Sequence, residues 1–336
     1  MITLLADHFA RWLPHVEDEM KRIIGVADET YRAFYGMIHY HFGWVDANFT
    51  SASASAGKRI RPMVCLLTCE AAGGDPLHAL PAAAAVELLH NFSLIHDDVE
   101  DRSELRRGRP TLWKVWGVPQ AINAGDALFT LAHSAFYRLR ERHVPPERQV
   151  EAHHRFSQTC LHLTQGQFLD MSFESRSDVR VDDYIQMVGG KTAALVSGAA
   201  AIGAIIAGSH RVDHYAEFGR QLGLAFQIED DLLGIWGDPQ VTGKSAADDV
   251  VNRKKSLPVL YGLQHSEELR ALYAAPEIDV LRVVELLERV GAREYATNAA
   301  GNYTQQATAA LDAAQPRGEA GKVLRELALS LLRRQA

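Results

Sequence analysis

The sequence predicts an all-α protein, a single large helical bundle around a central active-site cavity. Apolar residues recur at three- and four-residue spacing through most of the chain, and long runs with the two-residue alternation of β-strands are missing. The longest windows between turn signals are 79–101, 113–143, 146–173 and 184–208. Helices of this length favour a bundle over a small fold of short crossed helices.

Glycine and proline clusters divide the chain into about ten predicted helices. The breaks are expected at 51–57, 73–76, 107–110, 145–146, 175–183, 237–243 and 315–321. None of these segments is long enough to serve as a linker between two domains. The 336 residues slightly exceed the usual length of one core, but we expect one domain over residues 1–336.

Composition restricts the class of function. The chain has a formal net charge of −7 and 47% hydrophobic residues, which is typical of a globular protein and provides no basic field for nucleic acid. The first ten residues lack a basic region followed by an apolar run, so we expect no secretory signal and a cytoplasmic enzyme. The uncharged segment 192–209 has the length of a membrane span, but its Ala- and Gly-rich composition favours a helix packed inside a protein.

The first long apolar window ends in an acidic cluster. Asp97, Asp98 and Asp101 follow its apolar residues directly, and Asp97 and Asp101 lie one helical turn apart, about 6 Å along the axis. Mg²⁺ commonly takes one or two carboxylates together with substrate phosphates. The cluster is therefore a candidate magnesium site, and a solvated acidic helix end is the alternative.

A second acidic pair, Asp230 and Asp231, follows the apolar run 222–228. Two acidic pairs at the ends of separate helices could face each other across a cavity and hold a diphosphate through bridging metals. One turn beyond Asp230 the chain has Gly234 in place of a third acid. Asp238 lies between a glycine and a proline, so we interpret it as a turn residue and not as a ligand.

Basic residues gather at 57–62, 102–109, 190–192 and 243–255, and five of the eight lysines lie in these clusters. Lysine binds phosphate as a point charge, so the clusters are candidate phosphate contacts, with ordinary solvated basic surfaces as the alternative. His90 lies two turns before Asp97 on nearly the same helical face. It could contact phosphate or metal, although a single histidine is more often structural.

Together, these motifs resemble the trans-isoprenyl diphosphate synthase family, also called the polyprenyl synthetase family, from about Gly57 to Pro258. The shared order is Gly-Lys-Arg-x-Arg-Pro, then His-x-x-Ser-x-x-His-Asp-Asp-x-x-Asp with Arg106-Arg107-Gly108, then Lys191-Thr192, then Phe226-Gln227-x-x-Asp230-Asp231, then Gly243-Lys244. The resemblance implies an all-helical homodimer of the isoprenoid synthase type. Its reaction would be the head-to-tail condensation of an allylic diphosphate with isopentenyl diphosphate, with about three Mg²⁺ ions in each active site.

The resemblance also assigns roles to individual residues of this sequence. Mg²⁺ would be bound by Asp97, Asp101 and Asp230, with Asp98 and Asp231 supporting or sharing the ions. The allylic diphosphate would contact Arg106, Lys191, Lys244 and Lys254. The isopentenyl diphosphate would occupy a separate metal-free pocket of Lys58, Arg61, His90 and Arg107. The reacting carbons would lie beside Thr192 and Gln227. Many relatives carry an Asp where this chain has Gly234, which weakens the expectation of a third metal.

Product length depends on the side chains that precede the first acidic cluster. Phe92 lies five residues before Asp97, where bulk in this family ends elongation. With the small Ser93 beside it, the pattern resembles that of geranylgeranyl diphosphate synthases. Helical spacing alone brings Ser93 and His90 more directly under Asp97, and closure by Leu89 or by a neighbouring helix would give the shorter farnesyl product.

Two other functions stay open at this point. A class I terpene cyclase also uses a diphosphate, Mg²⁺ and an Asp-rich helix, but it would leave the basic residues of the isopentenyl pocket unexplained. A non-catalytic regulatory subunit of a prenyl synthase would explain Gly234, but not the complete first acidic cluster.

Overall fold

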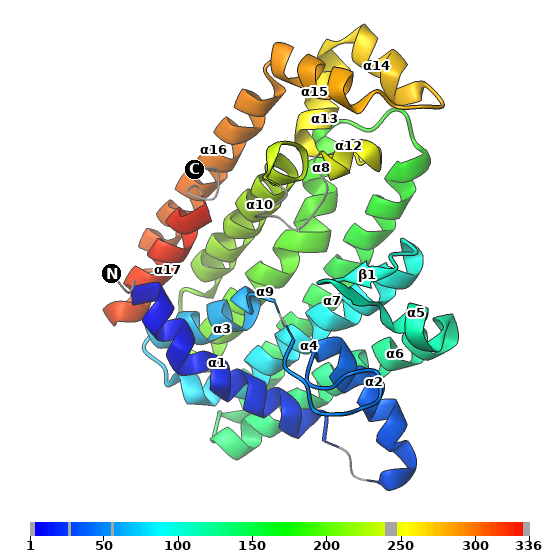
Figure 1. The fold of residues 1–336 in the computed structure, drawn as a ribbon. Coiled ribbons are helices and arrows are strands. Elements are labelled where there is room, and N and C mark those ends of the chain that lie inside the picture. Colours follow the sequence, from blue (N-terminus) through cyan, green and yellow to red (C-terminus); the bar gives the residue numbers. More distant parts are fainter. Residues whose placement is uncertain (1–3, 26–27, 55–56, 239–246, 332–336) are drawn as a thin grey trace. The chain divides into compact units, whose positions relative to one another are not determined.

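The computed structural model describes residues 4–25, 28–54, 57–238 and 247–331 (Figure 1). Contacts within the chain define two compact units. Unit 1 contains Met1–Phe156, Ala201–His210 and Arg317–Ala320, and unit 2 contains Ser157–Ala200, Arg211–Pro316 and Gly321–Ala336. Each unit is compact by itself, and the expectation of one domain over residues 1–336 stays a prediction.

The expected all-α fold is confirmed. The helices of unit 1 are α1 (Leu4–Ile23), η1 (Glu29–Tyr31), α2 (Arg32–Phe42), α3 (Ile60–Ala71), α4 (Pro76–Glu100), α5 (Leu112–Trp116), α6 (Val118–Ala135) and η2 (Phe136–Arg142). Unit 2 contains α8 (Val181–Val188), the π-helical turn η3 (Gly189–Ala193), α10 (Val212–Trp236), α12 (Asp248–Val251), α13 (Leu257–His265), α14 (Glu267–Ala274), α15 (Val280–Arg289) and α16 (Ala292–Ala313). Three helices have residues in both units, namely α7 (Pro146–Ser175), α9 (Ala194–Ala207) and α17 (Gly318–Leu331).

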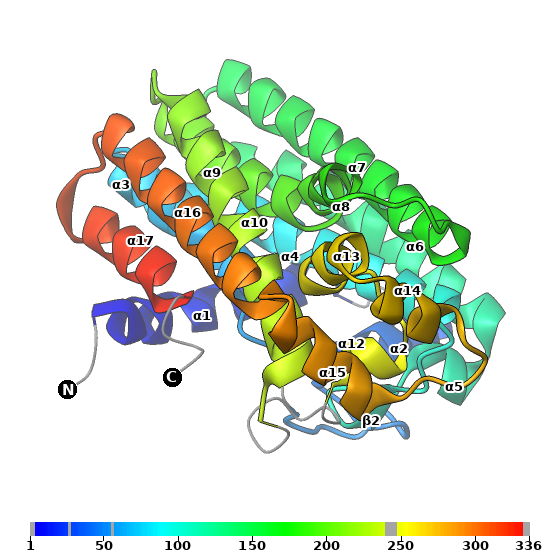
Figure 2. The ribbon, with the colours of Figure 1, turned by 90° about the horizontal axis from the view of Figure 1, so that it is seen from above.

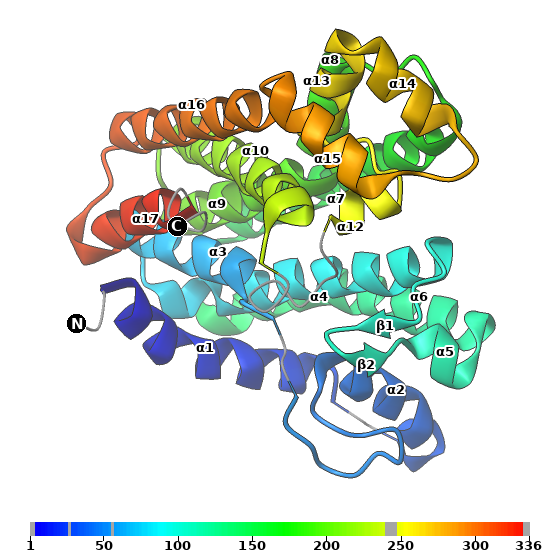
Figure 3. The ribbon, with the colours of Figure 1, turned by 45° about the horizontal axis from the view of Figure 1, so that its top comes forward.

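Helix α4 is the central element of unit 1, since α1, α3 and α6 all pack against it (Figure 3). Its start is defined by Asp75, whose side chain accepts a hydrogen bond from Leu77 N, and by Pro76 in the first turn. The apolar residues from Ala79 to Leu89 are almost completely buried, as expected for a helix that is apolar on all sides. The helix therefore holds the acidic cluster at its C-terminal end on a rigid support.

A short β-hairpin follows α4. Strand β1 (Leu105–Arg106) pairs antiparallel with β2 (Arg109–Pro110), and the two turn residues, Arg107 and Gly108, both have positive φ, 52° and 74°. Two-residue hairpin turns of this hand require positive φ at both positions, which Gly adopts freely and Arg does not. The tight turn thus places two adjacent arginines, one in a strained conformation, close after the acidic cluster.

In unit 2, α10 packs along α16 (Figure 2) and also packs against η3. Tyr215, Phe218, Leu222, Leu224 and Ile228 form much of the buried face of α10. The polar residues Gln227, Asp230 and Asp231 lie in the last turns of α10, so the packing of this helix fixes where the second acidic pair lies. The small helices α13, α14 and α15 pack on one another beyond this end.

The predicted helix windows hold with two corrections. The window 113–143 is interrupted at Gly117, whose φ of 85° separates α5 from α6. The described residues also contain more helices than the ten expected, because several are short. The window 184–208 is helical almost throughout, as α8, η3 and α9.

One helical run in the described part of the chain, Val181–Ala207, is long and apolar enough to cross a membrane. However, 72% of its most apolar window is buried inside the structure, as in the core helix of a globular protein. This agrees with the interpretation of segment 192–209 as a packed helix.

Candidate active site

The first acidic cluster lies at the C-terminal end of α4 in unit 1. The backbone N–H of Asp101 donates to the carbonyl of Asp97 at 2.8 Å, which continues the helical turn and puts both side chains on one face. Asp97 is half-buried and Asp101 is exposed. Their carboxylates therefore remain accessible to a ligand.

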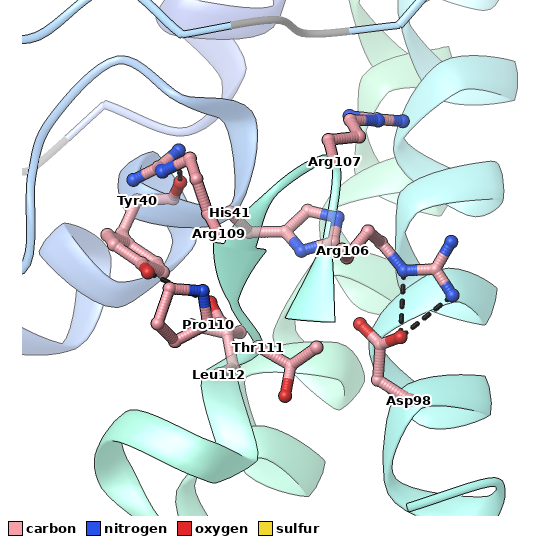
Figure 4. A pocket seen from close by; sticks show the side chains of 9 residues that line it. All are labelled: Tyr40, His41, Asp98, Arg106, Arg107, Arg109, Pro110, Thr111 and Leu112. Atoms are coloured by element: carbon pink, nitrogen blue, oxygen red, sulfur yellow. Dashed lines mark hydrogen bonds and ion pairs between the residues drawn. The ribbon is translucent and has the colours of Figure 1, made fainter. Parts of the chain in front are cut away.

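Asp98 lies on a different face and is only 2% exposed. Its Oδ1 accepts a hydrogen bond from Arg106 Nε at 2.8 Å and forms an ion pair with Arg106 Nη2 at 2.7 Å (Figure 4). Burial raises the pKa of Asp98, while the hydrogen bond from Arg106 opposes that shift. The two residues line a small pocket together with Tyr40, His41, Arg107, Arg109, Pro110, Thr111 and Leu112 (Figure 4). The contact ties the hairpin to α4.

The residues expected for the metal-free pocket gather in unit 1. Arg61 Nη1 lies 3.3 Å from His90 Nε2, and a Cβ added to Gly57, which has a φ of 86°, would lie 2.9 Å from Arg107 Nη2. The loop that carries the exposed Lys58 therefore begins against Arg107. Burial, and next the charges of Arg61 and Arg107, lower the pKa of His90 well below its ordinary value, so its imidazole is neutral at pH 7.

Arg59, between two of these residues, has a role that the sequence did not reveal. Its guanidinium is buried, with Nε 2.7 Å from Glu17 Oε1 and Nη1 2.7 Å from Glu87 Oε1. Asn91 also donates to Glu87 Oε1 at 2.9 Å. Because Arg59 precedes α3 with a positive φ of 48°, this buried ion pair fixes the backbone between Lys58 and Arg61. The motif Gly-Lys-Arg-x-Arg-Pro contained Arg59, but its buried partners are distant in sequence.

Lys191 lies in the π-helical turn η3 of unit 2, and π-turns inside helices are frequent at functional sites. Helix α7 approaches this turn so closely that a Cβ on Gly166 would lie 2.0 Å from Lys191 N and 2.5 Å from Gly190 C. Lys191 Nζ donates to Asp170 Oδ2 at 2.5 Å. Asp170 was not predicted from the sequence, although a glycine inside a helical window is a signal of such a close approach.

A hydrogen-bonded chain joins the next expected residues. Thr192 Oγ1 donates to Gln227 Oε1 at 2.9 Å, and Gln227 Nε2 donates to Asp231 Oδ1 at 3.0 Å. Asp231 Oδ2 in turn accepts from the Tyr184 hydroxyl at 2.6 Å and from Leu257 N at 3.0 Å. Asp231 is 0% exposed, so its carboxylate orients Gln227 and Thr192 from inside the protein. Asp230 beside it is half-buried.

Lys254 extends this network. Its Nζ lies 3.6 Å from Asp231 Oδ1 and 3.7 Å from Asp249 Oδ2, and its side chain is 44% exposed. Burial works against the charged form, but the carboxylates of Asp231 and Asp249, followed by those of Asp170 and Asp230, outweigh it and raise the pKa of Lys254. The lysine is therefore a permanent positive charge held beside the second acidic pair.

The predicted residues thus fall into two sets. Unit 1 contains Lys58, Arg61, His90, Asp97, Asp98, Asp101, Arg106 and Arg107, and unit 2 contains Lys191, Thr192, Gln227, Asp230, Asp231 and Lys254. Lys244 lies outside the described residues. The described part of the chain has no cluster of three or more His, Cys, Asp or Glu side chains that could hold a metal by themselves.

This donor set nevertheless fits Mg²⁺ in the form expected here. Mg²⁺ usually binds through one or two carboxylates and completes its shell with water and substrate phosphates, and not in an all-protein cage. Asp97 and Asp101 supply two accessible carboxylates on one helical face, and Asp230 supplies one. Asp98 and Asp231 are already bonded to protein donors, which suits support of the ligands more than direct binding.

The chain-length candidates lie on α4. Leu89 is completely buried. Phe92 is half-buried, and its ring centroid lies 5.0 Å from that of Phe129 on α6 and 4.7 Å from that of His96. Ser93 turns its hydroxyl back to the carbonyl of His90 at 2.8 Å. The large side chains next to the first acidic cluster in unit 1 are therefore the paired rings of Phe92 and Phe129.

Known proteins resemble this chain over most of its length. The sequence pattern of the family described as "Polyprenyl synthetase" matches residues 43–290. The chain is 44% identical over 285 residues to the geranylgeranyl diphosphate synthase of Mycobacterium tuberculosis, covering 82% of this chain and 80% of that protein. It is 41% identical over 283 residues to the (2E,6E)-farnesyl diphosphate synthase of the same organism, covering 80% and 77%.

A solved structure also matches. The polyprenyl synthetase from Streptomyces coelicolor superposes with a TM-score of 0.87 at 36% identity, over 98% of both chains. The match extends over the helical fold and over the segments that carry both acidic motifs. The chain accordingly belongs to the polyprenyl synthetase family and is a prenyltransferase.

Proposed function

We propose that this prenyltransferase condenses an allylic diphosphate with isopentenyl diphosphate, head to tail and with Mg²⁺, and that its product is geranylgeranyl diphosphate. The observation that carries the proposal is that unit 1 combines two kinds of anion site. The accessible acids Asp97 and Asp101 suit a diphosphate bound through metal. The cluster of Arg61, His90 and Arg107 has direct cationic and hydrogen-bonding donors, which suit a second diphosphate bound without metal.

The metals would be held by Asp97, Asp101 and Asp230, with Asp98 and Asp231 as supports. When bound, Mg²⁺ neutralises the charge that grows on a departing diphosphate. Lys191, Lys254 and Arg106 would contact the same leaving group through direct hydrogen bonds. Lys244 completes the proposed set from sequence alone.

The reaction balances without further reagents. The allylic C–O bond breaks, the double bond of isopentenyl diphosphate forms the new C–C bond, and one proton leaves with the released diphosphate as its acceptor. Thr192 donates its proton to Gln227, so the lone pairs of the Thr192 hydroxyl are available to stabilise positive charge on the allylic carbons. Exclusion of water by the apolar helices protects this cation.

Phe92 is the basis for proposing a geranylgeranyl product. Its contact with Phe129 supports a floor of two aromatic rings below the first acidic cluster, which would stop the growing chain by exclusion. Relatives of comparable similarity are described as geranylgeranyl and as farnesyl synthases. Farnesyl diphosphate is therefore the alternative product.

We also propose a cytoplasmic homodimer. Helix α7 exposes Leu161, Phe168 and Met171, with 62%, 69% and 45% of each residue accessible. Successive residues of this set lie seven and three positions apart, which is the spacing of apolar residues at a helix–helix interface. A second copy presenting the same apolar side chains is the occupant that such a self-complementary seam favours.

One assay separates this proposal from its rivals. The purified chain is given Mg²⁺, isopentenyl diphosphate and, in turn, dimethylallyl, geranyl or farnesyl diphosphate, and the products are identified. We expect isopentenyl diphosphate to be consumed and geranylgeranyl diphosphate to accumulate. A cyclase would release diphosphate from the allylic substrate without isopentenyl diphosphate, and a regulatory subunit would consume neither substrate. Either result would refute the proposal.

A further inference from the structure

A glycine interrupts the pattern of the second acidic motif. In the first motif, acids stand at Asp97 and one turn later at Asp101, whereas one turn after Asp230 the chain has Gly234. Gly234 is buried inside α10. Glycine in a helix interior is destabilising relative to alanine, and Gly234 does not have the positive φ that would require it. Neither helix propensity nor backbone conformation explains this glycine, which leaves a lack of space for a side chain as the reason.

The spatial reason is the carboxyl group of Asp249. A Cβ built on Gly234 would lie 2.5 Å from Asp249 Oδ2, 2.6 Å from its Cγ and 2.9 Å from its Oδ1. All three distances are shorter than real Cβ contacts, and all three involve the same carboxyl group. Asp249 comes from α12, which packs against α10, and is 4% exposed. The space beside position 234 is thus already occupied by an acid from another helix.

Asp249 also contacts a residue of the proposed site. Its Oδ2 lies 3.7 Å from Lys254 Nζ, and its carbonyl accepts a hydrogen bond from Lys254 N at 2.8 Å. On the other side, Lys254 Nζ lies 3.6 Å from Asp231 Oδ1. The ammonium group is therefore held between one carboxylate of the second acidic motif and one carboxylate of α12.

We propose that Asp249 completes the second acidic motif through space and acts as a positioning residue for Lys254. The assignment rests on the proposed function, since Lys254 is there a contact of the allylic diphosphate. A lysine side chain is flexible, and fixing its ammonium between two carboxylates reduces the conformational entropy that would be lost on binding a diphosphate. Because Asp231 and Asp249 lie on different helices, the same contact ties α12 to the end of α10.

The packing claim can be tested without any activity. Gly234→Ala is compared in the natural background and in an Asp249→Ala background by thermal unfolding. We expect Gly234→Ala to lower the melting temperature by about 3 °C or more in the natural chain, and to be neutral or stabilising once the carboxyl group is gone. Gly301→Ala on α16 is the matched control, because a Cβ there meets nothing within 4 Å. If Gly234→Ala lowers the melting temperature equally in both backgrounds, the proposed contact between position 234 and Asp249 is wrong.

The positioning claim is tested by moving the carboxylate. Asp249→Asn keeps the shape and removes the charge, and Asp249→Ala removes both. We expect each to raise the Michaelis constant for the allylic diphosphate by about tenfold or more, with little change for isopentenyl diphosphate. The double variant Gly234→Asp/Asp249→Ala restores an acid beside Lys254, so it should recover most of the lost affinity for the allylic diphosphate. Gly234→Asp alone should raise this Michaelis constant more than Asp249→Ala or the double variant does.

A binding measurement supplies the readout that is independent of turnover. Isothermal titration of inorganic diphosphate with Mg²⁺ should show the same loss for Asp249→Asn and the same recovery in the double variant. Equal changes in both Michaelis constants, or a double variant no better than Asp249→Ala, would show that Asp249 is merely structural. If the natural chain fails to consume isopentenyl diphosphate, the proposed function falls, while the unfolding and titration experiments still decide whether Asp249 acts on Lys254.

Discussion

At the scale of single residues, the carboxylates of the two acidic motifs differ in what already surrounds them. Asp98 and Asp231 are buried and accept strong hydrogen bonds from Arg106 and Tyr184. Asp97 and Asp230 are half-buried. A carboxylate that is bonded to protein donors orients the site, whereas a more accessible one can bind a metal or a ligand. We therefore propose that burial, and not residue type, separates a supporting acid from a metal-binding acid within each adjacent pair.

We therefore predict that Asp97→Ala and Asp230→Ala each reduce kcat on the order of 100-fold or more, because each removes a charge that, in the proposed mechanism, would hold a metal at the leaving group. Steady-state kinetics with saturating Mg²⁺ measures the effect. Asp238 is exposed, and Asp238→Ala should change kcat by less than about twofold. An Asp238 variant as inactive as the Asp230 variant would mean that the third metal site is misassigned.

The basic cluster of unit 1 leads to a second residue-scale prediction. Lys58→Ala and Arg61→Ala should mainly raise the Michaelis constant for isopentenyl diphosphate, about tenfold or more, since in the proposed site they would bind a phosphate that is remote from the breaking bond. The Michaelis constant for the allylic substrate should change much less. Initial rates with each substrate varied in turn provide the measurement, and the reverse pattern would show that the two pockets are exchanged.

At the scale of elements, close contacts between helices determine where the candidate site residues lie. The π-helical turn η3 carries Lys191 and Thr192, and α7 approaches it at Gly166. A turn with an extra residue is less stable than regular helix, so it persists because the surrounding packing requires it. The contact between α7 and η3 therefore determines where both side chains point.

We predict that Gly166→Ala destabilises the protein by about 2 kcal/mol or more, because its Cβ would overlap the backbone of Lys191. Activity should fall with stability, since the turn must shift. Chemical denaturation and kinetics on the same samples test both effects. Gly301→Ala serves again as control, as its Cβ has open space. Unchanged stability in the Gly166 variant would contradict the close approach.

The contact between α4 and α6 gives the prediction on product length. Shortening Phe92 to Ala removes one of the two facing rings, and we expect products longer than those of the natural enzyme because volume opens below the acidic cluster. Phe129→Ala should lengthen the products in the same direction. Product analysis by chromatography decides the matter. If neither variant alters the distribution, the floor of the cavity is formed by other residues.

At the scale of the whole molecule, exposed apolar side chains on α7 predict self-association. Large exposed apolar residues at helical spacing mark interaction surfaces more often than isolated ones do. Phe168 and Leu161 lie seven residues apart on one face of α7 and are among the most exposed apolar residues described. Their burial against a second copy would remove this surface from water.

We predict that the double variant Leu161→Glu/Phe168→Glu has half the mass of the natural protein in light scattering, because charged side chains cannot be buried without partners. The control is Leu281→Glu on α15, where the replaced side chain is 84% exposed and stands alone. It should not change the mass. A natural protein that is already monomeric, or a double variant that stays dimeric, would exclude this face as the interface.

Local pattern was sufficient to predict much of this protein. Apolar periodicity predicted the long helices, Gly and Pro clusters predicted their breaks, and spacing of four residues predicted that Asp97 and Asp101 share a face. The one long window that was wrong failed at Gly117, where a positive φ ends α5. These features depend on neighbours within a turn or two of the helix, which is the range over which a single sequence carries direct information.

The sequence by itself thus determined the helical class, the order of the motifs and the family. Only the tertiary structure decided which partners the charged side chains have: the Tyr184 hydroxyl donates to Asp231, Asp170 pairs with Lys191, and Glu17 and Glu87 pair with Arg59. These partners are 21 to 47 positions apart in sequence, a separation that no periodicity encodes. Their pairing follows from burial, because a charge removed from water must find its partner among the side chains that packing happens to bring within reach.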